Sequence, residues 1–421
     1  MSDAAADAPR PRRLRRLVAV VAVLALLLLS AGWLLQPQRS VPVLLDRIGR
    51  GLGLEITAGG VEARFRGTPQ LVVRDLRVRE PGAKTPLLVA DRALLSLPWS
   101  TLRSRGADLT IERVELDAPV LDVPALQAWL AKRPPGAETR IPTLTAGLRI
   151  VDGEIDNDDW RIAGVIVELP SLHPDRPANA RLRGRYLDPP TAIPFDLAVA
   201  LSKPANDAGV AAIGTLVVER GDWRMPATIH LSGPLHLGAD DIAMVPARLG
   251  VAARYESGDT RLPFTLGLAG PLRFDEATWV LAPAGVALRG EPPLPSLDAR
   301  GALALGRRLA IDLSGALPQW PEGWPALPPP VSASTAPLPF SLHYVGKPDL
   351  SAVTALSLHR DATRFDARFR LYDVLDWTQR PGGAPLPPLD GRLTSPKLVI
   401  SGATLDGVEV ELDDERIGKE D

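Results

Sequence analysis

The fold of this chain is constrained most by short runs in which every second residue is apolar, separated by Gly, Pro, Asp or Asn. Three clear examples are "IPFDLAVAL" at 193–201, "LPFTLGLAG" at 262–270 and "LPFSLHYVG" at 338–346. A period of two places successive side chains on opposite faces of a β-strand. We therefore expect most of the chain to form brief antiparallel strands with one covered face and one wet face.

The same three runs share Pro-Phe-x-Leu followed by an apolar residue two places later. This spacing predicts that each strand has one apolar face, and we take its positions as candidate ligand-lining residues. They are Phe195, Leu197, Val199, Phe264, Leu266, Leu268, Phe340, Leu342 and Tyr344. A second unit, in "IHLSGPLHLG" and "LGLAGPLRFD", predicts a strand, a Gly-Pro turn and another strand. Such repeated units are typical of a sheet that grows along one axis.

Helix and turn signals are fewer. Ser40 can cap a short helix that reaches Ile48, and a second short helix is expected from Pro124 to Arg133. The acidic group "VDGEIDNDDW" at 151–160 lacks the spacing of an EF-hand calcium loop, so it predicts a hairpin turn around Asn157. The terminal "ELDDERIGKED" predicts a solvated tail.

The amino-terminal region predicts a membrane anchor. Residues 17–35 include no charged side chain, and a helix of that length covers about 28 Å, close to the thickness of a bilayer's hydrocarbon core. Five arginines precede this span, so the positive-inside rule keeps residues 1–16 in the cytoplasm as a basic tail. A cleavable signal peptide is the alternative, but its apolar region is usually about 7 to 15 residues long.

Composition excludes several classes of function. A net charge of −2 gives no basic excess for nucleic-acid binding, and the absence of cysteine excludes disulfides, thiolate catalysis and cysteine metal sites. The five histidines have no metal-binding spacing, and neither a nucleophile elbow nor a phosphate-binding loop is present. We therefore expect no catalytic residue, no cofactor and no metal, and we predict a protein that is not an enzyme.

The order of pieces up to about Arg133 resembles the AsmA-like family, which includes the larger TamB-type proteins. The similar pieces are the span, "VPVLLDRIGRGLGLEIT", "VEARFRGTPQLVVRDLRV" and "LLVADRALLSLPWSTLRSRGADLTIERVELDAPVLDV". From Pro134 onward the similarity is one of texture, clearest in "GPLRFDEATWVL" and "SPKLVISGATLDGVEVEL". The expected organisation is a basic tail (1–16), a transmembrane anchor (17–35), an AsmA-like N-terminal region (36–133) and a repetitive β-sheet region (134–421).

The resemblance implies a single-pass inner-membrane protein of a Gram-negative cell, with the bulk of the chain in the periplasm. It also implies an elongated, mostly antiparallel sheet curved into a taco-like groove, with a few short helices. The expected function is outer-membrane biogenesis through the movement of phospholipid along that apolar groove. Alternation reports only that a face is buried and not by what, so a closed β-sandwich remains open. That alternative predicts a scaffold component of an envelope or type II secretion complex, with a protein partner.

Overall fold

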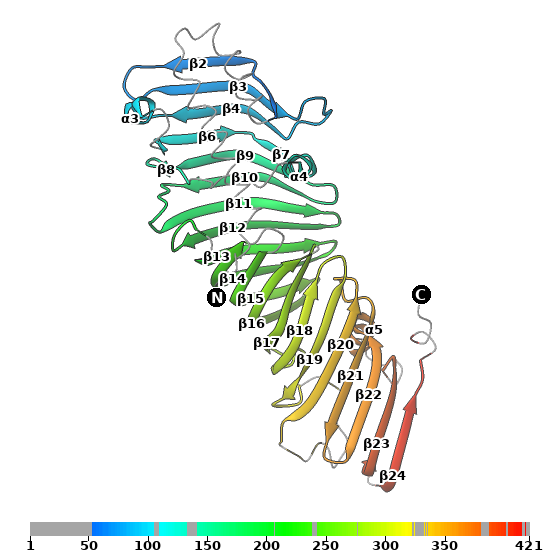
Figure 1. The fold of residues 1–421 in the computed structure, drawn as a ribbon. Coiled ribbons are helices and arrows are strands. Elements are labelled where there is room, and N and C mark those ends of the chain that lie inside the picture. The colour runs from blue at the N-terminus through cyan, green and yellow to red at the C-terminus, as the bar shows by residue number, and fades with distance from the viewer. Residues whose placement is uncertain are drawn as a thin grey trace, which may run out of the picture. The chain divides into compact units, whose positions relative to one another are not determined.

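The protein is mainly β, with few helices (Figure 1). The computed structural model describes residues 53–417 apart from 105–108, 133–140, 206, 238–241, 276, 322–323, 325–331, 333, 335, 380–386, 401–402 and 415–416. The chain divides into two compact units, unit 1 (Met1–Asp240) and unit 2 (Asp241–Asp421). The expected region boundary at 133/134 lies inside unit 1, among residues that are not described.

Unit 1 has fourteen strands in its described residues. They are β1 (Glu55–Thr57), β2 (Gly60–Arg64), β3 (Gln70–Arg79), β4 (Leu88–Ser96), β5 (Thr110–Ile111), β6 (Arg113–Asp117), β7 (Val120–Asp122), β8 (Thr143–Leu144), β9 (Leu148–Asp156), β10 (Arg161–Leu169), β11 (Ala178–Asp188), β12 (Thr191–Leu201), β13 (Ala208–Arg220) and β14 (Trp223–Leu237).

Twelve of these strands form one sheet, in which β1 and β2 both pair with β3, and β3 pairs with β4. Strand β4 pairs with β6 and β7, and these two run parallel to β9. From β9 to β14 each strand is antiparallel to the next along the chain. The remaining two, β5 and β8, form a short parallel pair. The predicted antiparallel sheet is therefore confirmed for most pairings, and β6, β7 and β9 make it mixed.

Unit 2 has ten strands in its described residues, each antiparallel to the next. They are β15 (Ile242–Ser257), β16 (Thr260–Asp275), β17 (Thr278–Gly290), β18 (Leu297–Leu305), β19 (Leu309–Leu317), β20 (Leu338–Gly346), β21 (Val353–Arg360), β22 (Thr363–Arg370), β23 (Leu389–Ile400) and β24 (Ala403–Leu412).

Three short helices complete the described fold: α3 (Trp99–Arg103), α4 (Val123–Ala131) and α5 (Leu371–Gln379). The predicted helix near Pro124 is confirmed as α4, which begins where the carboxylate of Asp122 accepts a hydrogen bond of 2.7 Å from the Ala125 backbone N–H. Among the described residues, no helix is both long and apolar enough to cross a membrane. The predicted span and the predicted helix at 40–48 lie outside those residues.

Two clusters of buried side chains form the core where helices cover the sheet of unit 1. Under α4, Leu126 and Trp129 pack with strand residues that include Val73 and Ala90, both of which have no exposed surface. Leu102 of α3 packs in a neighbouring cluster that contains the following residues: Leu95, Leu97, Ile111 and Leu144. The sheet therefore has a fully covered face at its amino-terminal end.

The structure corrects the prediction of Gly-Pro turns. Gly233-Pro234 lies within β14 and Gly270-Pro271 within β16, and both strands continue through the dipeptide. In β16 the pairing with β17 shifts register between Ala269 and Leu272. A proline has no N–H to donate, and an interrupted ladder is where that loss is tolerated. The strands are consequently longer than the brief runs expected.

The carboxyl end is a second correction. Ile417 is only 1% exposed and packs in a cluster with Ala367 and Leu389. Its backbone N–H donates to the carbonyl of Asp414 over 2.9 Å, so a local turn directs the side chain inward. One apolar residue therefore attaches the acidic segment to the sheet, and the segment is not wholly a solvated tail.

Candidate apolar binding face

Cross-strand pairing aligns apolar side chains into a row across unit 1. Paired residues on neighbouring strands point to the same face of a sheet, so the register decides which side chains lie side by side. Starting at Val73 on β3 and following the pairings to β14 gives what we call the unit 1 apolar row. It consists of Val73, Ala93, Leu116, Ile150, Val167, Leu182, Leu197, Gly214 and Ile229.

Unit 2 has a corresponding row that crosses all ten of its strands. The unit 2 apolar row consists of Leu249, Leu268, Val286, Ala299, Gly315, Phe340, Leu358, Phe365, Leu393 and Val410. Neither row contains a polar side chain. At about 4.8 Å between strands, each row is on the order of 40 Å long within its own unit.

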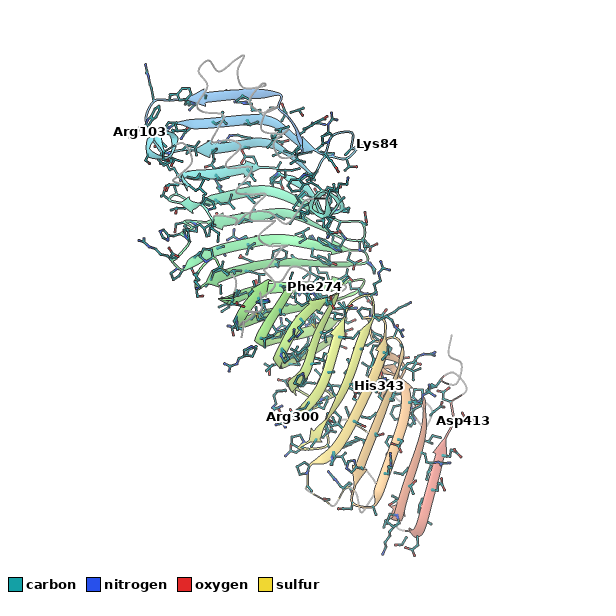
Figure 2. The ribbon with its side chains drawn as sticks, in the orientation of Figure 1. Lys84, Arg103, Phe274, Arg300, His343 and Asp413 are labelled. Carbon is teal, nitrogen blue, oxygen red and sulfur yellow. The ribbon has the colours of Figure 1, made fainter. Side chains whose placement is uncertain are left out.

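The neighbouring row of unit 2 points to the opposite face and has a different composition. It consists of Arg248, Ala269, Gly285, Arg300, Ser314, Ser341, Ser357, Asp366, Arg392 and Glu411, and Arg300 is labelled in Figure 2. This face carries ion pairs such as Arg392 with Glu411, and Ser357 donates a 2.5 Å hydrogen bond to Asp366. The two neighbouring rows of unit 2 therefore differ in polarity, and the sheet is amphipathic across them.

The apolar faces are only partly shielded from solvent. Leu182, Leu197 and Ile229 of unit 1 are half-buried, as are Leu249, Leu268 and Leu393 of unit 2. Within the described residues of unit 2, all strands belong to one sheet, and its main apolar cluster is made of side chains from β16 to β22 together with Trp320. The side chains of one sheet face thus bury one another laterally and leave apolar surface accessible.

All nine predicted face positions lie on strands, and most lie where the alternation places them. Leu266, Leu268, Phe340 and Leu342 come together in the main apolar cluster of unit 2. The three positions of the first run, Phe195, Leu197 and Val199, lie on β12 of unit 1 and are all half-buried.

Phe264 and Tyr344 differ from the rest of the predicted set. Phe264 lies between Ala253 and Gly290 on neighbouring strands and is half-buried. Tyr344 is only 1% exposed, and its hydroxyl donates to the carbonyl of Lys347 over 2.5 Å. A side chain as enclosed as Tyr344 supports the sheet and offers almost no surface to a ligand.

Two bulges add apolar residues that a strict period of two misses. The register between β15 and β16 shifts between Met244 and Ala247, and that between β17 and β18 shifts between Leu281 and Ala284. Each bulge inserts one extra residue, so the positions that point to the apolar face change between even and odd numbers along the strand. On β17, Val286 and Leu281 therefore lie in the same apolar cluster. The prolines at 246 and 283 were the available signal, because proline in a strand favours a bulge.

Phe195 illustrates how the uncovered face is shaped. It pairs with Gly184 on β11, and a methyl group added to that glycine would lie 3.0 Å from Cζ of the phenylalanine. The ring therefore lies against bare backbone and covers it. This arrangement provides a flat apolar surface without requiring a second layer.

On the polar face of unit 1, Asp196 is held by two arginines. Arg181 donates a pair of hydrogen bonds, of 2.9 and 2.8 Å, to its carboxylate, and Arg183 donates a third of 3.0 Å. The hydrogen bonds from Arg181, with the charges of both arginines, lower the pKa of the Asp196 carboxyl below its usual value. The residue between two apolar positions, Phe195 and Leu197, is thus fixed in its charged form.

The acidic segment forms the predicted hairpin. Strands β9 and β10 are joined at Asn157, whose N–H donates to the carbonyl of Trp160 over 2.9 Å. Burial raises the pKa of Asp156, and the nearby charge of Glu154 raises it further, while Arg161 pairs with Glu154 over 2.7 Å. Among the described residues no group of acidic or histidine side chains could hold a metal ion.

A hollow of about 550 Å³ lies beside the β21–β22 turn of unit 2. Ser341, Ser357 and His359 contribute to its wall, and His359 pairs with Arg364 across the hairpin. Ser341 and His359 are exposed, and the hydroxyl of the half-buried Ser357 is already bound to Asp366. The hollow provides no activated nucleophile, so the continuous apolar face remains the stronger candidate site.

Comparisons with known proteins identify no relative of this chain. No family model, curated protein or solved structure matches this chain.

Proposed function

We propose that this protein is an envelope protein, anchored in the inner membrane, that handles phospholipid by holding acyl chains along its apolar sheet faces. The observation that carries the proposal is the pair of apolar rows, each uninterrupted by a polar side chain and each with half-buried leucines. Apolar surface that stays accessible along rows of this length favours a partner that is itself apolar.

Acyl chains suit these rows because both are long and narrow and because apolar contacts between them require no specific orientation. Burial of each methylene contributes about 0.8 kcal/mol, so one chain of ordinary length can contribute on the order of 10 kcal/mol before the cost of ordering it. The headgroup would remain in water at the rim of the sheet. In this mechanism no residue acts as a catalyst, and the protein lowers the free energy of a lipid tail outside the bilayer.

The two faces of β16 provide a direct test, because Leu266 and Thr265 are adjacent in sequence and point in opposite directions. Leu266 belongs to the apolar cluster, and Thr265 is exposed and pairs with Arg289. A photo-crosslinking amino acid would be placed at either position in the full chain, which is expressed in a Gram-negative host with radiolabelled phosphate. We expect labelled phospholipid on the protein only for the probe at position 266.

The matched variants Leu266→Glu and Thr265→Glu check the same point by lipid mass spectrometry after detergent exchange. A charge on the apolar face should remove bound phospholipid, and a charge on the polar face should leave it. Phospholipid bound equally in both variants, or crosslinked equally from both positions, would reject the proposal. A protein crosslinked to position 266 in place of lipid would support a scaffold role.

A further inference from the structure

One end of the unit 1 sheet presents aromatic and basic side chains together. The β2–β3 connection and α3 are adjacent there, because the indole N–H of Trp99 donates to the carbonyl of Gly67 over 2.9 Å. The backbone N–H of Leu97 also donates to the carbonyl of Pro69 over 2.8 Å. Figure 2 labels Arg103 at this end, opposite the end that carries Lys84.

The aromatic rings at this end are exposed although their supports are buried. Phe65 is 47% exposed and Trp99 is 46% exposed. In the helix that carries Trp99, Thr101 and Leu102 are buried, and the Thr101 hydroxyl donates to the carbonyl of Thr110 over 2.6 Å. Trp99 therefore projects from a helix that is fixed to the sheet, and the connection that carries Phe65 is held to Trp99 at Gly67.

The two segments that carry these rings have charged side chains of one sign only. Segments 64–70 and 97–104 contain three arginines, Arg64, Arg66 and Arg103, and no acidic residue. All three are exposed, and the described residues supply no ion pair to any of them, in contrast to nearby Arg74, which pairs with Glu62 over 3.0 Å. We call Phe65, Trp99 and these three arginines the aromatic–arginine patch.

We propose that the aromatic–arginine patch docks on the surface of an anionic phospholipid bilayer. Tryptophan and phenylalanine favour the boundary between headgroups and acyl chains, and each arginine near an anionic surface is attracted to it. The chain itself supports this occupant, because only the 19 residues 36–54 lie between the predicted span, which ends at Leu35, and the first strand at Glu55. At most about 3.6 Å per residue, that connection limits Glu55 to within about 70 Å of the membrane.

The docking concerns one edge of unit 1 and does not depend on whether the apolar rows carry lipid. It would fix the orientation of the sheet against the bilayer, which the covalent connection to the anchor does not do by itself. Aromatic and arginine side chains are also enriched in protein interfaces, so a protein partner is the alternative that the test must exclude.

The absence of native cysteine allows a clean test in the full chain reconstituted into vesicles. Ser100, exposed beside Trp99, would be changed to cysteine and labelled with an environment-sensitive fluorophore. A matched label at Ser232, exposed on β14, serves as the control. The vesicles contain either phosphatidylcholine alone or phosphatidylcholine with 30% phosphatidylglycerol, together with a lipid that carries a shallow nitroxide quencher.

We expect quenching at position 100, strong in the anionic vesicles and weak in the neutral ones, and none at position 232. Replacing Arg64, Arg66 and Arg103 by glutamine should weaken docking about fivefold for each arginine, with circular dichroism verifying that the variant is folded. Two results would overturn the proposal. One is the absence of quenching at position 100, and the other is quenching unchanged by the triple variant. A blue-shifted fluorophore that does not respond to the lipid quencher would identify a protein cover and equally reject a bilayer.

Discussion

The apolar row of unit 1 passes through two regions that differ in what lies on top of it. At its amino-terminal end, α4 covers the sheet and leaves Val73 with no exposed surface, while Leu126 and Trp129 are at most 5% exposed. On β11 to β14 the same row continues through half-buried residues such as Leu197 and Ile229. An identical pattern of alternation therefore leads to a closed core in one region and an accessible face in the other, and the difference is the presence of a helix.

The largest expected effect concerns the covered region. Trp129→Ala removes the main side chain of α4 from the core and should lower the free energy of unfolding by about 3–5 kcal/mol. Leu197→Ala, on the accessible face, should cost only about 1–2 kcal/mol because less surface is lost. Chemical denaturation of both variants measures the contrast. Equal losses would mean that β11 to β14 are covered as fully as β3 and β4.

The second prediction compares how substitutions on the two faces of β12 change phospholipid binding. Leu197→Glu should lower the amount of bound phospholipid at least about tenfold, because a carboxylate would enter the path of an acyl chain. Ala198→Glu changes the exposed neighbour on the polar face and should leave binding unchanged. Lipid mass spectrometry of the full chain compares the two. If both variants lost lipid, misfolding of β12 would explain the result better than a blocked face.

A smaller change in stability is expected when a larger side chain is placed in the covered core or on the accessible face of unit 1. Ala90→Leu overpacks the covered core and should cost about 1–3 kcal/mol. Gly184→Ala brings a methyl group to 3.0 Å from the Phe195 ring, which can move outward on an uncovered face, so the cost should stay below about 1 kcal/mol. Thermal unfolding followed by circular dichroism distinguishes them. A larger loss for Gly184→Ala would show that something restrains the ring.

The smallest effect belongs to the polar face and depends on pH. The folded protein holds the pKa of Asp196 below its unfolded value of about 3.9, so the stabilisation is present above that pH and is lost as pH falls through the lower, folded value. Asp196→Asn should therefore be slightly less stable than the wild type at pH 7. That difference should disappear in strong acid. Denaturation curves across this range test it, and a constant difference would contradict the ion-pair origin.

Much of the strand content and of the apolar face could be predicted from the sequence, because both depend on the local period of two. The residues 195, 197 and 199 are on one face for that reason alone. Register could not be predicted in this way, since it is set by pairing between strands and by bulges such as those beside Pro246 and Pro283. The cover could not be predicted either, because α4 reaches the sheet only after the chain has folded.

The predicted Gly-Pro turns and the predicted solvated tail were wrong because contacts with residues distant in the sequence determine the structure of these segments. Gly270-Pro271 has the composition of a turn, but the pairing of Gly270 with Ala247 on β15 and of Leu272 with Leu281 on β17 keeps the strand continuous. Ile417 is an apolar residue in an acidic segment, and only the nearby Ala367 and Leu389 give it a place to be buried. In both cases a long-range contact overrides the local preference.

Pairing in chain order has a kinetic consequence. From β9 to β14, and again from β15 to β24, each strand pairs with the strand that precedes it in the chain. It can therefore join the sheet as soon as that preceding strand is in place. Local pairing of this kind keeps loop-closure entropy low and permits rapid, stepwise growth. The parallel contact of β6 and β7 with β9 is the exception, because α4 and its flanking residues must first be in place. That junction should be the slow step, after which the sheet can lengthen hairpin by hairpin as the chain arrives.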